Sequence, residues 1–455
     1  MQLGVGADEG RGTGNLPLAD VKILSAEQMI SLPYMTQLLA MLGATVVKVE
    51  PPGGEPGRAS VPFFVADDGT RHGATFARAN FNKASLVIDL KQPEGRELFL
   101  RLAPKFDVIA ENMRPGVMDR LGLGYEAVSA VAPESVYLSV SGFGCLDPSP
   151  YREWPAYAPV VEAMSGLYEM GREPGARLKT NIAGALGDVA TAIFSAVGVL
   201  AALRRRDQTG TGERVDVAML DSMIAVNDMY AQMWSLGTTV NGRRAGVMGS
   251  FRAADGDFIM AALREHQLER LARLMSRPDW LTDPRLATRR DWYTRTDELI
   301  RPAVEAWAGS KSKLQAARVL AENGIAAGPS FTPADLADDE HVRMRNMLVE
   351  VEGQQGTMRV SGNPVKFSRS GDGPVRRFPD VGADTDAVLS FHLGLSQEEL
   401  AHLHRKRVIL QTSGAIWRTL KLSIQIYGPG GPRRSGGGTV ASGGSHPDQR
   451  RRPHL

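Results

Sequence analysis

Short apolar runs alternate with longer stretches of helical periodicity along the first half of the chain. The runs rich in β-branched residues stand at 21–24, 45–49, 86–90, 108–110, 136–140 and 214–217. Helical spacing of apolar residues appears between them, at 34–42 and 94–102. This alternation predicts an α/β fold with a large, Rossmann-like parallel-sheet domain covered by helices on both faces. Ligands of such sheets bind beyond the carboxyl ends of the strands.

The pattern changes near residue 225. Four stretches carry apolar residues at helical spacing: 220–236, 268–275, 298–307 and 314–322. They predict a smaller α+β domain over 225–330, in which Asp255-Gly256 is expected to form a hairpin turn. Residues 331–410 return to mixed strand and helix, with strand candidates at 348–351 and 358–360. We expect this last segment to complete the large domain that begins with 18–224.

Both ends of the chain have the composition of disordered segments. Residues 1–17 are Gly-rich with few apolar side chains, and the Gly/Ser/Pro-rich tail 411–455 holds seven basic residues and one acid. Setting the tail aside leaves 46 basic and 50 acidic residues. The sequence pI of about 8.6 therefore reflects the tail, and it gives no support to a nucleic-acid partner for the body of the chain.

Several classes of protein are excluded by composition. The single cysteine, Cys145, cannot form an internal disulfide and has no cysteine partner for a metal cage, which fits a reducing cytoplasm. The longest apolar run, 189–203, is shorter than a bilayer requires, and the N-terminus lacks the basic start of a signal peptide. We therefore expect a cytoplasmic protein with no membrane partner and no metal site.

A dinucleotide cofactor is also disfavoured. No G-x-G-x-x-G opens the helix after the first strand, where Leu32-Pro33-Tyr34 stands instead. That fingerprint brings the backbone close to a pyrophosphate, so its absence argues against an NAD or flavin site.

Asp188 is the most informative residue. It follows Gly187 where the apolar run 189–203 begins, which places a carboxylate at the start of a buried helix. Free backbone N–H groups and the helix dipole are expected to keep such a carboxylate ionised without a salt bridge, as a nucleophile requires. By position alone, a simple helix N-cap is the alternative reading.

A colinear set of motifs resembles the class III CoA-transferases, a family that includes formyl-CoA and carnitine CoA-transferases and α-methylacyl-CoA racemase. The resemblance runs from about residue 18 to 409. It rests on seven segments: LGATVVKVE at 42–50, NFNK at 80–83, DLK at 89–91, ENMRPG at 111–116, RLGLG at 120–124, SGFG at 141–144 and GD at 187–188.

The resemblance implies a homodimer of two interlocked rings that binds acyl-CoA and a carboxylic acid acceptor, with Asp188 as the nucleophile. It implies coenzyme A contacts at Met29, Ile30, Ser31, Ile88, Asp89, Leu90, Lys91, Asn112, Met113, Arg114, Arg120, Trp154, Pro155, Ala156, Tyr157 and Ala158. Moving CoA between acids without hydrolysis needs a protein carboxylate that forms a mixed anhydride and then an aspartyl-CoA thioester.

This sequence departs from the family pattern in places. Glu162 replaces a usual Gln, Ala158 replaces a usual Asp, and Leu32 is expected to narrow the passage of the thioester. These changes leave open a catalytically silent paralogue that binds acyl-CoA. A 2-methylacyl-CoA racemase or isomerase is a further alternative, but Tyr157 stands where the racemases carry His.

Overall fold

The computed structural model describes residues 16–411 apart from 66–68, 70, 148, 171, 173–174, 181–183, 239–244, 352–357 and 374–377. The expected tail lies outside the described residues except for Gln411, and most of the expected leader, 1–15, lies outside them as well.

The centre of the large domain is a seven-stranded sheet in the order β14-β5-β2-β1-β6-β7-β8. Its strands are β1 (Lys22–Ala26), β2 (Thr45–Glu50), β5 (Lys83–Ile88), β6 (Val108–Glu111), β7 (Val136–Ser141), β8 (Arg214–Ala218) and β14 (Ile409–Leu410). All neighbours pair in parallel except β14, which runs antiparallel to β5. The predicted α/β parallel-sheet fold is confirmed. The strand expected at 86–90 instead spans Lys83–Ile88, so Asp89 and Leu90 follow it.

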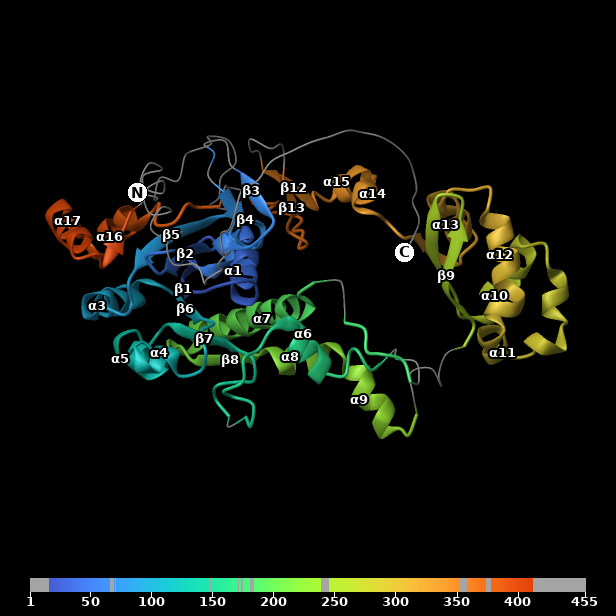
Figure 1. Cartoon of the computed structure of the whole chain (residues 1–455), viewed down its shortest axis with the longest axis horizontal. Helices are drawn as coiled ribbons and strands as arrows, with labels where there is room; N and C mark the ends of the chain where they lie inside the picture. Colours follow the sequence, from blue (N-terminus) through green and yellow to red (C-terminus); the bar gives the residue numbers. More distant parts are fainter. Residues whose placement is uncertain are drawn as a thin grey trace, which may run out of the picture. The chain divides into compact units, whose positions relative to one another are not determined.

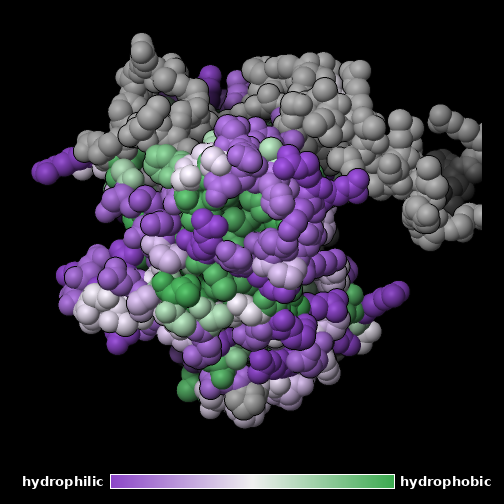
Figure 2. All heavy atoms as spheres, turned by 90° about the vertical axis from the view of Figure 1, so that its left-hand side faces the viewer, coloured by the Kyte–Doolittle hydropathy of each residue, from purple (hydrophilic) through white to green (hydrophobic). Residues whose placement is uncertain are grey.

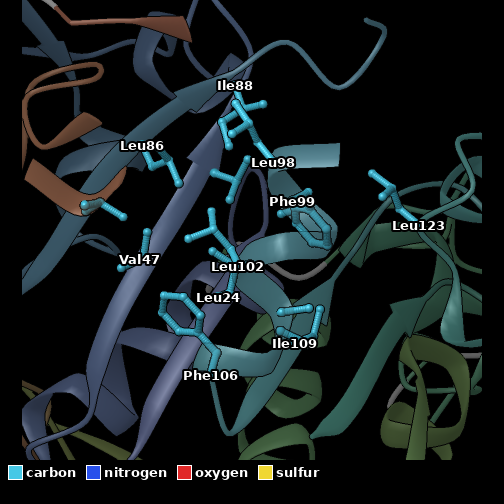
Figure 3. Close-up of a cluster of buried hydrophobic side chains, with 14 of the residues drawn as sticks. Leu24, Val47, Leu86, Ile88, Leu98, Phe99, Leu102, Phe106, Ile109 and Leu123 are labelled. Atoms are coloured by element: carbon cyan, nitrogen blue, oxygen red, sulfur yellow. The ribbon is translucent and has the colours of Figure 1, made fainter. Parts of the chain in front are cut away.

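Alternate residues of the strands enter two separate cores. On β1, Leu24 joins a cluster with Val47 and Ile109, whereas Ile23 joins a second cluster on the opposite face. Figure 3 shows the first cluster, in which side chains of α3 (Pro93–Leu102) such as Phe99 pack on the sheet. This period-two alternation is what a sheet covered on both faces requires.

Helices cover both faces of the sheet (Figure 1). The cluster on one face includes residues of α3 (Pro93–Leu102), α4 (Val117–Arg120), α5 (Tyr125–Val131), α16 (Thr385–Leu393) and α17 (Gln397–Arg405). The cluster on the other includes residues of α1 (Ser31–Met41) and α7 (Leu186–Thr209). The face formed by α3, α5 and α16–α17 is mostly hydrophilic, with hydrophobic patches among the hydrophilic residues (Figure 2).

Helix α7 is longer than its apolar run suggests. By length and composition its 24 residues could cross a membrane, so the length argument from 189–203 does not hold for the helix that forms. However, Ala192, Val199 and Leu203 pack with Leu32 and Leu39 of α1, in the core over the sheet. Such packing is typical of the central helix of a globular domain.

The region predicted to be one helix at 220–236 forms two, α8 (Met219–Val226) and α9 (Asp228–Ser235), which meet at Asn227. Asn227 has φ −100° and ψ 32°, outside the helical range, and its side chain donates to the Ser165 carbonyl at 3.0 Å. The Asn227 side chain is thus bound to a carbonyl 62 residues earlier in the chain, and the non-helical backbone at Asn227 separates the two helices.

Residues 247–329 contain a three-stranded antiparallel sheet with its own core. Its strands are β9 (Val247–Ala253), β10 (Gly256–Ala262) and β11 (Ala326–Pro329), and its helices are α10 (Glu265–Leu274), α11 (Arg289–Thr294), α12 (Arg301–Ala308) and α13 (Lys313–Glu322). The hairpin expected at Asp255-Gly256 joins β9 to β10. The sequence pattern anticipated this hairpin but not the third strand, β11. Phe251 and Phe258 of the hairpin pack among the apolar residues of the helices.

The remaining helices and strands come before and after residues 247–329 in the sequence. They are β3 (Phe63–Val65), β4 (Arg71–Gly73), α2 (Ala74–Ala77), α6 (Ala158–Met164), α14 (Pro333–Asp338), α15 (Glu340–Met344), β12 (Leu348–Val351) and β13 (Met358–Ser361). The two strands expected at 348–351 and 358–360 pair as a hairpin. Val360 of this hairpin joins Phe64 and Phe76 in a small aromatic core.

Candidate active site

Three of the predicted CoA-contact segments follow strands whose carboxyl ends share one edge of the sheet. Residues 29–31 follow β1, 89–91 follow β5 and 112–114 follow β6. Parallel strands place these segments along the same edge, which is where α/β sheets bind ligands. Arg120 comes from the end of the short helix α4, a few residues beyond the third segment.

The loop after β1 is held in a fixed shape by two side chains from elsewhere. Asn112 clamps Gln28, because its Oδ1 accepts the Gln28 N–H at 2.9 Å and its Nδ2 donates to the Gln28 carbonyl at 2.9 Å. Glu55 Oε2 accepts the next N–H, that of Met29, at 3.0 Å. Met29 has φ 64°, a left-handed conformation that costs energy for a residue with a side chain. The Asn112 amide thus supports the loop. Ile30 precedes α1, and Ser31, its first residue, is buried.

The segment 88–91 offers a ligand its backbone and one cation. Ile88 is 1% exposed and Leu90 packs against the same core, so neither presents a free side chain. Asp89 accepts from the Lys91 N–H at 3.0 Å and from Gln92 Nε2 at 3.1 Å, which orders the entry to α3. The Lys91 side chain is exposed.

Lys91, Arg114 and Arg120 share one property. All three are exposed, and none of them forms an ion pair with another residue in the described part of the chain. Exposed cations without partners at the carboxyl edge of a parallel sheet suit the phosphates of a nucleotide. Met113, between Asn112 and Arg114, is partly buried against the core.

The segment 154–158 joins exposed aromatic residues to a buried helix start. Trp154 is 56% and Tyr157 68% exposed, and Pro155 is exposed with them. Ala156 packs close to Gly142, where a Cβ would meet its Cβ at 2.3 Å. Ala158 is buried and begins α6.

Asp188 is the third residue of α7, where α6 packs against the helix start (Figure 1). The N-cap position is occupied by Ala185, with φ 54° and no side-chain cap hydrogen bond. The alternative reading of Asp188 as the N-cap is therefore wrong. The Asp188 carboxylate forms no hydrogen bond or ion pair with any other described residue, and the residue is partly buried.

The environment of Asp188 makes its carboxylate more basic than usual. Burial raises the pKa of Asp188 from 3.8 to about 6, the Arg78 charge opposes this rise, and the Glu162 charge adds to it. Loss of solvation is the largest cause of this rise. A partly buried, unpaired carboxylate with a raised pKa has the character of a nucleophile.

Two charged residues near Asp188 have roles that the sequence reasoning did not assign. Arg78 ends the short helix α2 and is exposed, with no ion-pair partner in the described part of the chain. Glu162 is 2% exposed, and its Oε1 accepts the Gly187 N–H at 2.9 Å. The sequence singled out Glu162 only as a replacement for a usual Gln. Its hydrogen bond with the Gly187 N–H, 25 residues away, is visible only in the structure.

Leu32, which departs from the family pattern, does not narrow the candidate site. Its side chain is 0% exposed and packs in the core between α1 and α7. The expectation that Leu32 crowds a thioester is wrong, because the side chain points into the protein interior.

Several residues of the motifs that carry the family resemblance have buried, charged side chains close to α1. Lys83 Nζ lies 2.7 Å from Glu27 Oε1 and donates to the Pro33 carbonyl at 2.8 Å. Although burial opposes ionisation, Lys83 and Lys48 hold the pKa of Glu27 below its usual range. Burial lowers the pKa of Lys83 to about 8, against the attraction of Glu27.

A second buried pair continues this network along β2. Arg58 Nη2 lies 2.6 Å from Glu50 Oε1, and Ser85 Oγ donates to the same oxygen at 2.7 Å. Despite its burial, Arg58 lowers the pKa of Glu50 to about 2. The Glu55 N–H donates to Glu50 Oε2 at 3.1 Å, and Lys48 Nζ lies 3.2 Å from Glu55 Oε1 and 3.7 Å from Glu27 Oε1. Glu55 is also the residue that holds Met29. The motif charges therefore shape the β1–α1 loop.

A polar cavity near Arg114 is too small for an acyl group. Its volume is about 10 Å³, and Glu111, Cys145 and Arg214 are among the residues that line it. This is about the space of one water molecule. Burial raises the pKa of Glu111 to about 7, against the Met113 N–H that its carboxylate accepts at 2.8 Å.

Residues 18–385 match the sequence profile of a family described as CoA-transferase family III. The chain is 34% identical over 380 residues to the succinyl-CoA:mesaconate CoA-transferase of Haloarcula hispanica, covering 80% of this chain and 93% of that protein. It is 32% identical over 413 residues to the succinyl-CoA–D-citramalate CoA-transferase of Chloroflexus aurantiacus, covering 86% and 98%. A CAIB/BAIF family protein from Brucella suis superposes with TM-score 0.73 at 29% identity, over 83% of this chain and 100% of that one.

Proposed function

The chain belongs to CoA-transferase family III, and we propose that it moves CoA from an acyl-CoA thioester to a free carboxylic acid through covalent intermediates on Asp188. The observation that carries this proposal is the state of Asp188. Its carboxylate is partly buried at the start of α7, has no partner among the described residues and has a pKa raised to about 6. At neutral pH most of it is ionised, and its raised basicity makes it a better nucleophile than a solvated carboxylate.

The first half of the proposed reaction loads CoA onto the protein. An Asp188 oxygen attacks the thioester carbonyl, the carbon–sulfur bond breaks, and CoA leaves as a thiolate. The product is a mixed anhydride between Asp188 and the acyl group. The thiolate then attacks the aspartyl carbonyl carbon, the donor acid leaves as a carboxylate, and an aspartyl-CoA thioester remains.

The second half repeats these steps with the acceptor acid. Its carboxylate attacks the aspartyl thioester, which forms a new anhydride and frees the thiolate again. The thiolate attacks the acceptor's carbonyl carbon, which yields the new acyl-CoA and restores the Asp188 carboxylate. Holding these partners together can supply roughly 7–11 kcal/mol of the barrier.

We assign CoA binding to the carboxyl edge of the sheet. The unpaired cations Lys91, Arg114 and Arg120 suit the phosphates, and the exposed rings of Trp154 and Tyr157 suit apolar parts of the ligand. The clamped loop at 28–30 is preorganised, so little of its ordering entropy is lost on binding.

For the substrates we propose a dicarboxylic acid, such as succinate, as one of the two partners. The names of the two relatives support it, since both use succinyl-CoA. Arg78 gives independent support, because this exposed cation lies close enough to Asp188 to oppose the rise in its pKa. Its guanidinium could bind the carboxylate that does not react.

We also propose that the chain works as an interlocked homodimer in the cytoplasm. Helices α7, α8 and α9 carry exposed apolar side chains, including Val197 at 59%, Ile224 at 49% and Trp234 at 82% exposed. Monomeric proteins rarely leave so many large apolar groups in water on neighbouring elements. A second copy of the chain would cover them.

The test is a transfer assay with purified protein. Succinyl-CoA is mixed with a panel of free acids, and new acyl-CoA products are identified by mass spectrometry. We expect transfer by the native chain and a loss on the order of 10⁴-fold or more for Asp188→Asn. Asp207→Asn, an exposed acid near the other end of α7, serves as the matched control and should retain activity.

Two outcomes would contradict the proposal. Asp188→Asn with activity within tenfold of the native chain would remove Asp188 from the chemistry. Binding of acyl-CoA by the native chain with no product from any acid would instead support the silent paralogue, and loss of an α-deuteron from a 2-methylacyl-CoA would support the isomerase.

A further inference from the structure

Glu162 is a buried acid with no cation to balance it. It is 2% exposed and forms no ion pair with the residues that the structure describes. Both of its carboxylate oxygens instead accept hydrogen bonds from neutral donors: Oε1 from the Gly187 N–H at 2.9 Å, and Oε2 from the Tyr168 hydroxyl. Burying an acid is costly unless hydrogen bonds compensate it, and these two bonds do so.

The Glu162 carboxylate has a role at this position because α7 begins without a capping side chain of its own. The N-cap residue Ala185 has a left-handed backbone and no side chain that can accept a hydrogen bond. Its role falls to Glu162, which reaches across from α6, 25 residues earlier in the chain. A side-chain acceptor at a helix start satisfies a backbone N–H that has no partner within the helix and so stabilises the first turn. The capped group is the N–H of the residue directly before Asp188.

The packing around Gly187 leaves this turn little freedom. A Cβ on Gly187 would lie 3.0 Å from Val161 Cγ2 and 3.2 Å from Ala158 Cα, so α6 sits directly on the first turn of α7. Thr191 Oγ1 donates to the Gly187 carbonyl at 2.6 Å from the other side. Gly187 is thus held at its N–H, its Cα and its carbonyl.

The Glu162 carboxylate also acts on the pKa of Asp188. Its negative charge raises the pKa of Asp188, in the same direction as burial, while Arg78 at the end of α2 opposes both. Among the described residues, Arg78 and Glu162 are the charged groups that shift the pKa of Asp188. Tyr168, on the far oxygen of Glu162, orients the carboxylate.

We propose that Glu162 is a positioning residue that fixes the first turn of α7 through the Gly187 N–H, and thereby sets the direction and the charge environment of the Asp188 carboxylate during CoA transfer. The inference rests on the proposed role of Asp188 as nucleophile. It assigns Glu162 two separable contributions, an acceptor atom that holds the turn and a negative charge beside the nucleophile.

Two substitutions separate these contributions. Glu162→Gln keeps an oxygen acceptor for the Gly187 N–H and removes the charge, whereas Glu162→Ala removes both. The readouts are kcat, KM and the pH profile of kcat/KM for CoA transfer, measured on the full chain. Glu169→Gln is the matched control, because Glu169 is an exposed acid that pairs with Arg172 on the surface.

For Glu162→Gln we expect kcat to be largely kept and the acidic limb of kcat/KM to move to lower pH. The sign follows because removing a like charge stabilises ionised Asp188, so the nucleophile stays charged in more acidic solution. For Glu162→Ala we expect kcat to fall by on the order of 100-fold with little change in KM, which is the cost of misplacing a reacting group by about 1 Å.

The proposal fails if the acidic limb of Glu162→Gln coincides with that of the native chain and of Glu169→Gln. It also fails if Glu162→Ala keeps the native kcat. If Glu162→Ala does not fold, Glu162→Gln alone decides. Failure of the proposed function looks different: Asp188→Asn would then remain active, whatever the two Glu162 variants do.

Discussion

At the scale of single residues, Asp188 is set apart by the balance of two opposing effects. A carboxylate in the first turn of a helix gains about 0.3–1 kcal/mol from the dipole. The rise of its pKa from 3.8 to about 6 corresponds to about 3 kcal/mol in the opposite direction. The desolvation caused by burial is therefore the larger effect, and the helix dipole offsets only a small part of it. The result is a carboxylate that is ionised at neutral pH and poorly solvated.

This balance predicts the pH dependence of activity. Only the ionised form of Asp188 can attack a thioester, and its pKa is raised to about 6. The value of kcat/KM should therefore be level at neutral pH and fall about tenfold for each unit below 6. Initial rates between pH 4.5 and 8 would check this, with the fold monitored by circular dichroism. A profile that stays level down to pH 4.5 would show that Asp188 has an ordinary pKa or no part in the chemistry.

At the scale of elements, the network around Lys83 ties β1, β5 and α1 together. Lys83 Nζ contacts Glu27, the Pro33 carbonyl and Asn80 Oδ1, all within 2.9 Å. Buried pairs of this kind are weak evidence for net stability, yet removing one partner leaves an uncompensated charge. The network therefore affects stability mainly when one of its partners is removed.

Lys83→Met should lower the free energy of unfolding by about 3–5 kcal/mol, because Glu27 would stay buried with only Lys48, 3.7 Å away, to balance it. Urea denaturation at neutral pH measures this. The exposed Lys105→Met is the control and should change the free energy by no more than about 0.5 kcal/mol. Equal, small losses for both variants would mean that the buried network is not a structural element.

Much of this element-level architecture follows from sequence pattern. The six parallel strands were predicted because each is a short β-branched run between helices, and Asp188 stood out as a carboxylate before a long apolar run. The hairpin of β9 and β10 was expected at Asp255-Gly256, but the third strand, β11, was missed. It is only four residues long and follows the strong helical periodicity of α13.

The long-range contacts of the site could not be predicted. Asn112 meets Gln28 across 84 positions, Lys83 meets Glu27 across 56, and Glu162 meets Gly187 across 25. Nothing in local spacing distinguishes these partners from other polar residues. The predicted CoA contacts at Asn112 and Asp89 stay predictions; in the structure both side chains form hydrogen bonds that hold nearby backbone groups.

At the scale of the whole molecule, the sheet provides the site in two parts. Its carboxyl edge presents the clamped loop and the unpaired cations, and α7 presents Asp188, the proposed nucleophile, from the face that it shares with α1. The exposed apolar side chains of α7–α9 lie on the same helix that carries Asp188 and on its neighbours. A second copy that covers them would also exclude water from the surroundings of Asp188, as an anhydride intermediate requires.

The most direct test of the account follows the oxygen atoms of Asp188. In the proposed cycle the donor acid leaves with one Asp188 oxygen, and the acceptor acid replaces it. Turnover with an acceptor whose carboxylate carries heavy oxygen should therefore label the peptide that contains Asp188, detected by mass spectrometry after proteolysis. Label should be absent without the acyl-CoA donor and in Asp188→Asn. If native protein completes many turnovers and this peptide stays unlabelled, Asp188 is not the covalent centre.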